Sequence, residues 1–181
     1  MSIIEGVLIA WIILYLIPDL IFHHLQWHAF QGSRDIPAVA LTFDDGPGPD
    51  TALVLDALKK SGAHATFFIV AERGRNYPEI LQRMVAEGHQ IGVHGYHHRS
   101  MYLFWPWQVF QELQTAVQTI EDLTGVRPTV YRAPWGHTNA VTLWALKRLK
   151  LTRVFWSIAP DDWRPDRTAD FIAHYVVQLS Q

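Results

Sequence analysis

The sequence alternates between short apolar runs and longer segments in which apolar residues recur every three or four positions. Short runs rich in β-branched, aliphatic and aromatic residues are typical of strands, and the longer spacing is typical of amphipathic helices. Strands are therefore predicted at 38–43, 65–70, 90–93, 129–131 and 152–158. Helices are predicted at 50–61, 77–87, 106–124, 138–150 and 168–181. This alternation predicts an α/β fold with a parallel sheet covered by helices, either open or closed into a barrel.

Polar side chains follow the predicted strands at the point where each one ends. They are Asp44 and Asp45 after the first strand, His94 and His98 after the third, Arg132 after the fourth, and Asp162 after the fifth. By itself, an Asp-Asp-Gly-Pro run is more often an ordinary turn than a site. The loops that leave the carboxyl ends of parallel strands form one face, however, so these side chains are expected to converge.

The spacing of two histidines suggests metal binding at this face. On one helical turn, His94 and His98 would point the same way, which suits neighbouring positions on a metal ion. A carboxylate added to them leaves coordination positions open for water and substrate, as a catalytic site requires. His97 could replace His98 only with a different local backbone, so it ranks below. His64 and His89 begin predicted strands away from this face and are interpreted as surface or packing residues.

The amino terminus has a different character. Residues 3–22 are apolar apart from Glu5, Gly6, Pro18 and Asp19, which is about the length that a membrane-spanning helix requires. A cleaved signal peptide would show a basic start and a small-residue cleavage site, and neither is visible. A buried soluble helix is the other alternative. An uncleaved, single-pass membrane anchor over 1–22 is the preferred interpretation.

The anchor is expected to be followed by a juxtamembrane linker over 23–36 and a catalytic domain over 37–181. Three histidines of the linker, His23, His24 and His28, are interpreted as interface residues rather than metal ligands.

Composition narrows the choice of function further. The 181 residues are 49% hydrophobic, which is enough for the core of one catalytic domain beside the anchor. The chain contains no cysteine, so a metal would be held by nitrogen and oxygen ligands. A formal charge of −2 gives no basic field and argues against nucleic acid as a partner, and no protein partner is inferred.

Four motifs of this chain resemble those of a known family. Thr42-Phe43-Asp44-Asp45-Gly46, His94-Gly95-Tyr96-His97-His98, Arg132-Ala133-Pro134-Trp135-Gly136 and Asp162-Trp163 are similar to the successive motifs of the polysaccharide deacetylases with the NodB homology domain, carbohydrate esterase family 4. The resemblance runs from about Pro37 to the end of the chain. It implies a distorted (β/α) barrel and a divalent metal, usually Zn²⁺, with Co²⁺ or Mn²⁺ as alternatives. It also implies removal of N-acetyl groups from amino-sugar polymers such as peptidoglycan or chitin, and so an extracytoplasmic domain.

The same resemblance implies a role for each motif residue. Asp44 would be the general base, and the metal ligands would be Asp45, His94 and His98. Arg132 would hold Asp44 in place and would itself pair with Asp162. Substrate contacts are expected at Pro134, Trp135 and Trp163. The backbone N–H of Trp135 would help to hold the oxyanion. The chemistry agrees with these roles, because a divalent ion activates water near neutral pH and an arginine keeps a neighbouring carboxylate ionised.

The chain departs from the family pattern at two places. The usual final strand and its histidine, the expected general acid, would lie beyond Gln181, and His174 is interpreted as a helix-face residue that does not replace it. Ala159 stands where the family commonly has a first aspartate. A catalytically impaired module that binds glycan or metal, and an amidohydrolase acting on a small amide, therefore remain as alternatives to a deacetylase.

Overall fold

A computed structural model describes residues 2–24, 29–32 and 38–180, apart from the side chains at 19 and 22–24. Most of the predicted linker over 23–36 lies outside the described residues. The same holds for its three candidate interface histidines, because His28 and the side chains of His23 and His24 are not described. The catalytic domain is described from residue 38 onward.

Five parallel strands form the sheet in the order in which they occur along the chain. They are β1 (Thr42–Gly46), β2 (Thr66–Ile69), β3 (Gln90–Val93), β4 (Val130–Tyr131) and β5 (Thr152–Arg153). The predicted α/β fold with a parallel sheet is therefore confirmed. Sequential order without a reversal is the arrangement of a barrel wall. Within the described residues, however, no pairing between β1 and β5 closes the barrel.

Helices alternate with the strands as the apolar periodicity predicts, with one additional helix of 4 residues after β2 that was not predicted. They are α3 (Thr51–Ser61), α4 (Ala71–Gly74), α5 (Pro78–Ala86), α6 (Pro106–Thr124), α7 (Ala140–Leu149) and α8 (Ala169–Leu179), with short 3₁₀ turns at Met101–Leu103 and Pro134–Gly136. Proline opens α5 and α6, where its missing N–H costs no helical hydrogen bond. Gly125 ends α6 with a φ of 72°, a conformation that glycine adopts without strain.

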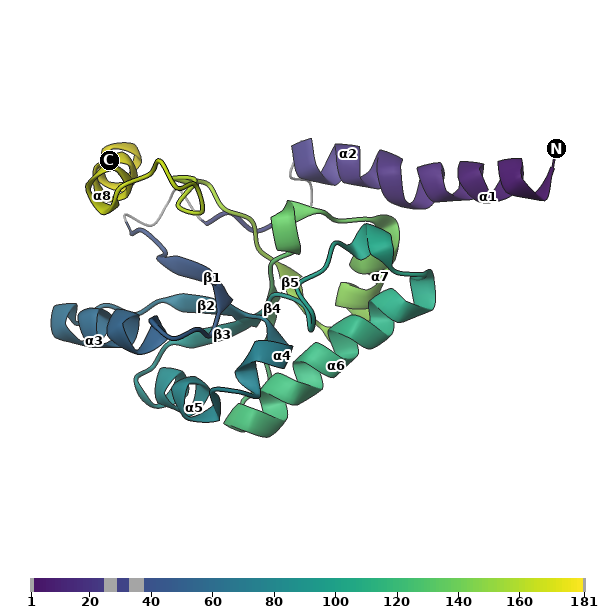
Figure 1. Ribbon diagram of the computed structural model, residues 1–181. Coiled ribbons are helices and arrows are strands. Elements are labelled where there is room, and N and C mark those ends of the chain that lie inside the picture. Colours follow the sequence, from purple (N-terminus) through teal and green to yellow (C-terminus); the bar gives the residue numbers. More distant parts are fainter. Residues whose placement is uncertain (1, 25–28, 33–37, 181) are drawn as a thin grey trace.

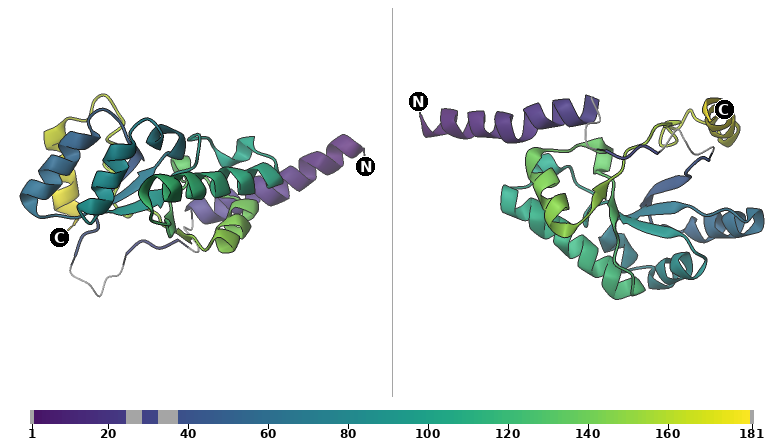
Figure 2. Two further views of the ribbon diagram at one scale, coloured as in Figure 1. Left: turned by 90° about the horizontal axis from the view of Figure 1, so that it is seen from below. Right: turned by 180° about the vertical axis from the view of Figure 1, so that it is seen from behind.

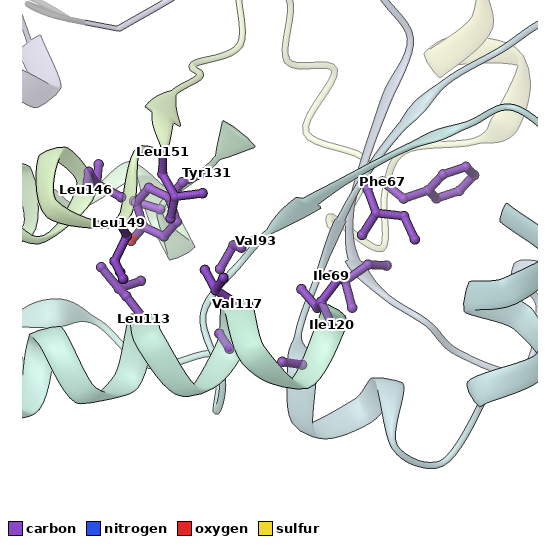
Figure 3. Close-up of a cluster of buried hydrophobic side chains, with 14 of the residues drawn as sticks. Phe67, Ile69, Val93, Leu113, Val117, Ile120, Tyr131, Leu146, Leu149 and Leu151 are labelled. Atoms are coloured by element: carbon purple, nitrogen blue, oxygen red, sulfur yellow. The ribbon is translucent and has the colours of Figure 1, made fainter. Parts of the chain in front are cut away.

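The core lies between the sheet and the helices on one side of it. In Figure 1, α3, α5 and α6 lie together on that side. Figure 3 shows Val93 of β3 facing Val117 of α6, with Ile69 of β2 close to Ile120 of the same helix. All four side chains are at most 1% exposed. Burial of these apolar surfaces fixes α6 against the strands whose ends carry the polar motifs.

Several strand boundaries differ from those predicted, and those of the first strand change the position of the acidic pair. The first strand begins at Thr42 rather than 38, because residues 38–41 are exposed and pairing with β2 starts at Thr42. The same strand extends to Gly46 rather than ending at residue 43, so Asp44 and Asp45 lie within β1 instead of following it. The last strand ends at Arg153, after which Val154 forms a parallel bridge with Phe30.

The amino-terminal residues form consecutive helical segments, α1 (Ile3–Trp11), a π-helical turn (Ile12–Leu16) and α2 (Ile17–His24). Figures 1 and 2 show these segments at the opposite end of the molecule from α8. Among the described residues, no helix combines the length and the apolar character needed to cross a membrane. The anchor predicted over 1–22 is therefore not supported.

One residue of the π-helical turn fixes this part of the chain to the domain. Tyr15 is 4% exposed, and its hydroxyl donates a 2.9 Å hydrogen bond to the carbonyl of Phe104. Its ring lies 6.4 Å from that of Tyr102 between centroids. The amino-terminal helices thus rest on the loop that precedes α6.

Candidate metal centre

The site begins at an irregularity in β1. Phe43 is paired with Phe67 and Gly46 with Ile69, so three steps along β1 correspond to two steps along β2. This extra residue is a β-bulge, a feature that redirects side chains beside active sites. Adjacent residues of a regular strand would face opposite sides of the sheet. The bulge is therefore what allows Asp44 and Asp45 to reach one site.

Asp45 adopts the left-handed conformation at this bulge, with a φ of 66°. This conformation is uncommon for residues other than glycine, although aspartate tolerates it better than most. The Arg73 side chain of α4 donates a hydrogen bond to the Asp45 carbonyl and so supports the conformation.

The carboxylate of Asp45 meets two imidazoles. Its Oδ1 atom lies 2.8 Å from Nε2 of His98 and 3.2 Å from Nε2 of His94. One donor atom from each of the three residues lies within 4.8 Å of the others. The structure thus brings Asp45, His94 and His98 together, as the sequence analysis expects.

His94 is oriented by its second ring nitrogen. Its Nδ1 lies 2.7 Å from the carbonyl oxygen of Arg132, and the residue is 3% exposed. This contact leaves Nε2 as the ring nitrogen that faces Asp45. A ring N–H held by a backbone carbonyl is the usual outer contact of a histidine that binds metal.

The segment between the two histidines is a bend rather than the helical turn that was predicted. His98 has a φ of 50°, which turns its ring back toward His94, and the two ring centroids are 5.2 Å apart. His97 points elsewhere, because its Nδ1 lies 2.8 Å from Oε2 of Glu112. The lower rank given to His97 as a ligand agrees with this placement.

The second carboxylate has a different partner. Arg132 donates hydrogen bonds of 2.8 Å from one nitrogen to Oδ1 of Asp44 and to the hydroxyl of Thr42. The guanidinium is buried and lies 4.2 Å from the centroid of the Phe68 ring. This charged contact orients the Asp44 carboxylate.

The two imidazoles also determine the charge of the Asp45 carboxylate. Hydrogen bonds from His94 and then His98 hold the pKa of Asp45 far below its usual value, and burial opposes them only in part. Asp45 therefore stays ionised and is available as an anionic ligand over the whole range of physiological pH.

The residues predicted to contact substrate differ in exposure, and Trp135 lies beside the metal cluster. Trp135 is 55% exposed, has a φ of 54°, and its ring lies 4.6 Å from the His98 ring between centroids. No backbone hydrogen bond found in the described part of the chain uses its N–H. Pro134 is buried beneath the site, and Trp163 is 79% exposed.

The pairing expected between Asp162 and Arg132 is not found. Asp162 is exposed, and in the described ranges no hydrogen bond or ion pair joins it to Arg132. The residue before it, Asp161, has a φ of 54°. Within the part of the chain that the structure describes, the buried Nε atom of Arg132 has no hydrogen-bond partner.

Sequence reasoning missed three side chains that support the site. They are Thr42, Arg73 and Glu112. A signal for Glu112 is present in the sequence, because a carboxylate stands among Val109, Leu113 and Ala116 on the apolar face of the predicted helix. A charged residue on a buried face requires a partner.

The donor set suits a divalent transition metal. Two imidazole nitrogens and one carboxylate oxygen are typical ligands of a catalytic zinc ion with open positions. The contact between Nδ1 of His94 and the Arg132 carbonyl supplies the outer shell that such ligands need. With Asp44 held beside it, the cluster combines a metal site with a proton acceptor, which is the arrangement needed for metal-assisted hydrolysis.

The sequence is similar to those of polysaccharide deacetylases, as the geometry of the site leads us to expect. The sequence model described as Polysaccharide deacetylase matches residues 31–154. The chain is 36% identical over 140 residues to the peptidoglycan-N-acetylmuramic acid deacetylase PdaC of Bacillus subtilis (strain 168), covering 77% of this chain and 29% of the relative. It is 38% identical over 128 residues to a chitooligosaccharide deacetylase of Bradyrhizobium sp. (strain ANU 289), covering 70% of this chain and 58% of the relative. The chain thus spans less than two thirds of the length of either relative.

Solved structures show the same fold. A family 4 carbohydrate esterase from Streptomyces lividans, in complex with acetate, superimposes with a TM-score of 0.73 and 32% sequence identity. The match covers 76% of this chain and 71% of that one.

Proposed function

Because this chain belongs to the polysaccharide deacetylase family, we propose that it hydrolyses the N-acetyl groups of amino-sugar residues in a polysaccharide and releases acetate. Peptidoglycan and chitin-like glycans are the substrate classes that the names of its relatives suggest. The observation that carries the proposal is the cluster of Asp45, His94 and His98 beside an Asp44 carboxylate held by Arg132.

The proposed mechanism assigns the metal to Asp45, His94 and His98, and Zn²⁺ suits these nitrogen and oxygen donors best. When bound, such an ion lowers the pKa of a coordinated water and polarises the acetamide carbonyl. Asp44 accepts the proton of the attacking water as the general base. Arg132 holds that carboxylate in position, since the 2.8 Å contact fixes one oxygen and leaves the other for the water.

Two further groups are proposed to contact the substrate. The N–H of Trp135 serves as a donor to the developing oxyanion, and the exposed Trp135 ring offers a flat surface to a sugar. Asp162 is proposed to approach Arg132, and the buried, unpartnered Nε of Arg132 supports this pairing. Trp163, next to Asp162, is proposed to reach substrate in the same movement.

We also propose that the domain acts outside the cytoplasm, attached to the cell membrane through residues 1–22. The support is an exposed apolar surface on the amino-terminal helices, where Ile3, Ile4 and Leu20 are 88%, 80% and 59% exposed. Fractionation of cells that express the chain tests this, with protease added to intact cells. Recovery in the soluble fraction, or full protection from protease, would contradict the proposal.

The central experiment measures acetate release from N-acetylated chitin oligomers and from peptidoglycan. The purified chain is expected to release acetate, to lose this activity in a chelator, and to regain it with Zn²⁺ or Co²⁺. Asp45→Asn is expected to lower both metal content and activity, because an amide is a weaker ligand than a carboxylate. His174→Gln, a change on the exposed face of α8, is the matched control.

Two outcomes would replace this proposal with another. Saturable glycan binding without acetate at any protein concentration would indicate a binding module. Hydrolysis of small amides but not of glycans would indicate a different amidohydrolase.

A further inference from the structure

A buried carboxylate lies next to the metal cluster but takes no part in it. Glu112 is 6% exposed and stands on the core-facing side of α6, between Val109 and Leu113. A carboxylate is costly to bury, so its presence there requires strong hydrogen-bond donors.

The donors come from the bend that joins the two metal-ligand histidines. Oε1 of Glu112 accepts hydrogen bonds from the backbone N–H groups of Tyr96 and His97, at 2.9 and 2.8 Å. Oε2 lies 2.8 Å from Nδ1 of His97. Both oxygens of one side chain therefore hold the bend between His94 and His98.

The opposite side of the same bend is held by α4. The carbonyl of Gly95 accepts from the N–H of Ala71, and that of Tyr96 accepts from the N–H of Glu72, both at 3.1 Å. The peptide groups of the bend are thus fixed by Glu112 on their N–H side and by the first turn of α4 on their C=O side.

This restraint bears on His98, which follows the bend directly. A φ of 50° is unfavourable for histidine, so the conformation persists only where its surroundings determine it. Without the Glu112 carboxylate, the N–H groups of Tyr96 and His97 would lose their acceptor. The bend could then relax toward an ordinary conformation that turns His98 away from Asp45.

We propose that Glu112 is a positioning residue of the metal site, which holds the bend at 95–97 so that His98 meets Asp45 and His94 before metal binds. The inference rests on the metal centre of the proposed function. The same proposal assigns a role to His97, whose ring contacts the second oxygen of Glu112 rather than the metal.

The test compares metal affinity among variants of the full chain. Zn²⁺ affinity is measured by calorimetry, and the Co²⁺ absorption spectrum reports the ligand set. Glu112→Ala is expected to lower Zn²⁺ affinity about 10- to 100-fold, as the loss of outer-shell partners typically does. Glu112→Gln keeps an acceptor for both N–H groups and is expected to stay within about threefold of the unaltered chain.

Val117→Ala is the matched control for stability. Val117 lies on the same helix, is 1% exposed and packs in the hydrophobic core. It is expected to lower the melting temperature without changing Zn²⁺ affinity or the Co²⁺ spectrum. A Glu112→Ala variant that melts lower but binds Zn²⁺ like the unaltered chain would overturn the positioning role.

A measurement on the unaltered chain covers the case in which Glu112→Ala does not fold. The N–H groups of Tyr96 and His97 are expected to be protected from hydrogen exchange in the metal-free protein. Rapid exchange at both positions would overturn the proposal. Failure of the unaltered chain to bind any divalent metal would overturn both this inference and the proposed function, whereas equal affinities among the Glu112 variants would overturn this inference alone.

Discussion

The Oδ1 atom of Asp44 accepts a 2.8 Å hydrogen bond from the guanidinium of Arg132, a residue 88 positions further along the chain. The contact joins β1 to the end of β4 across the face of the sheet where the metal cluster lies. A charged hydrogen bond of this length fixes the orientation of the carboxylate. The first prediction follows from this arrangement.

Asp44→Asn is expected to abolish proton transfer while leaving metal binding intact. An amide of the same shape can still contact Arg132, but it cannot accept the proton of the attacking water. The turnover number kcat for acetate release should fall about 100- to 10,000-fold, the usual contribution of a general base. Zinc content, measured by mass spectrometry after dialysis, should match the unaltered chain. Loss of zinc together with activity would show that Asp44 is a ligand instead.

Trp135→Ala is expected to weaken substrate binding more than turnover. The exposed ring beside His98 is placed to stack on a sugar, and aromatic contacts contribute about 0.5–1.5 kcal/mol. KM for a chitin oligomer should therefore rise about two- to tenfold. Trp105→Ala, which removes another exposed ring, is the control and should leave KM unchanged. An unaltered KM in the Trp135 variant would place the sugar elsewhere.

Gly92→Ala is expected to destabilise the fold through steric overlap. A Cβ at this position of β3 would lie 2.6 Å from Cδ1 of Phe68 and 2.9 Å from Cγ2 of Val130. Overpacking of this kind costs about 1–3 kcal/mol in the free energy of unfolding. Gly48→Ala is the matched control, because its Cβ would meet nothing within 4 Å. Chemical denaturation of the two variants should therefore give clearly different midpoints.

Stability is expected to decrease as the pH falls below about 6.5, the usual pKa of histidine in an unfolded chain. Burial lowers the pKa of His89 in the folded protein, so unfolding takes up a proton in this range. The contribution of neutral His89 is complete above pH 6.5 and is lost progressively as the pH drops toward the folded-state pKa. His89→Asn, which keeps an acceptor for the N–H of Ala65, should reduce this dependence.

The check is the melting temperature at pH 7.5 and pH 5.5, measured in chelator so that bound metal does not contribute. His174→Asn, on the exposed face of α8, should retain the dependence of the unaltered chain. A His89 variant that retains it as well would show that other groups cause the acid sensitivity.

Periodicity was sufficient to predict the frame of the fold but not the local backbone of the site. The helix at 106–124 was predicted with the bounds that α6 has, because its apolar spacing and its terminal Pro106 and Gly125 are local signals. The bulge at Asp44 and Asp45 has no local signal, since it exists only in the pairing of β1 with β2. The spacing of the histidines correctly predicted that His94 and His98 lie together, but the helical turn assumed for it was wrong. A bend held by Glu112 brings His98 to His94 instead.

For the amino-terminal helices, composition alone was not enough to predict how the segment is placed. Its apolar composition predicted a membrane anchor, which the helices of the described residues do not support, and composition gives no sign of the contact between Tyr15 and the loop at Phe104. Tertiary contacts of this kind depend on a distant part of the chain and leave no trace in the hydropathy of the segment itself.

The backbone has a positive φ at three residues of the site, which are Asp45, His98 and Trp135. Glycine adopts this left-handed conformation more easily than other residues do. Selection for folding alone would therefore favour glycine at all three positions, and each replacement would delete a ligand or the exposed ring. Laboratory evolution toward greater heat resistance should therefore include a screen for hydrolysis. At these positions, stability favours glycine, whereas catalysis requires the present side chains.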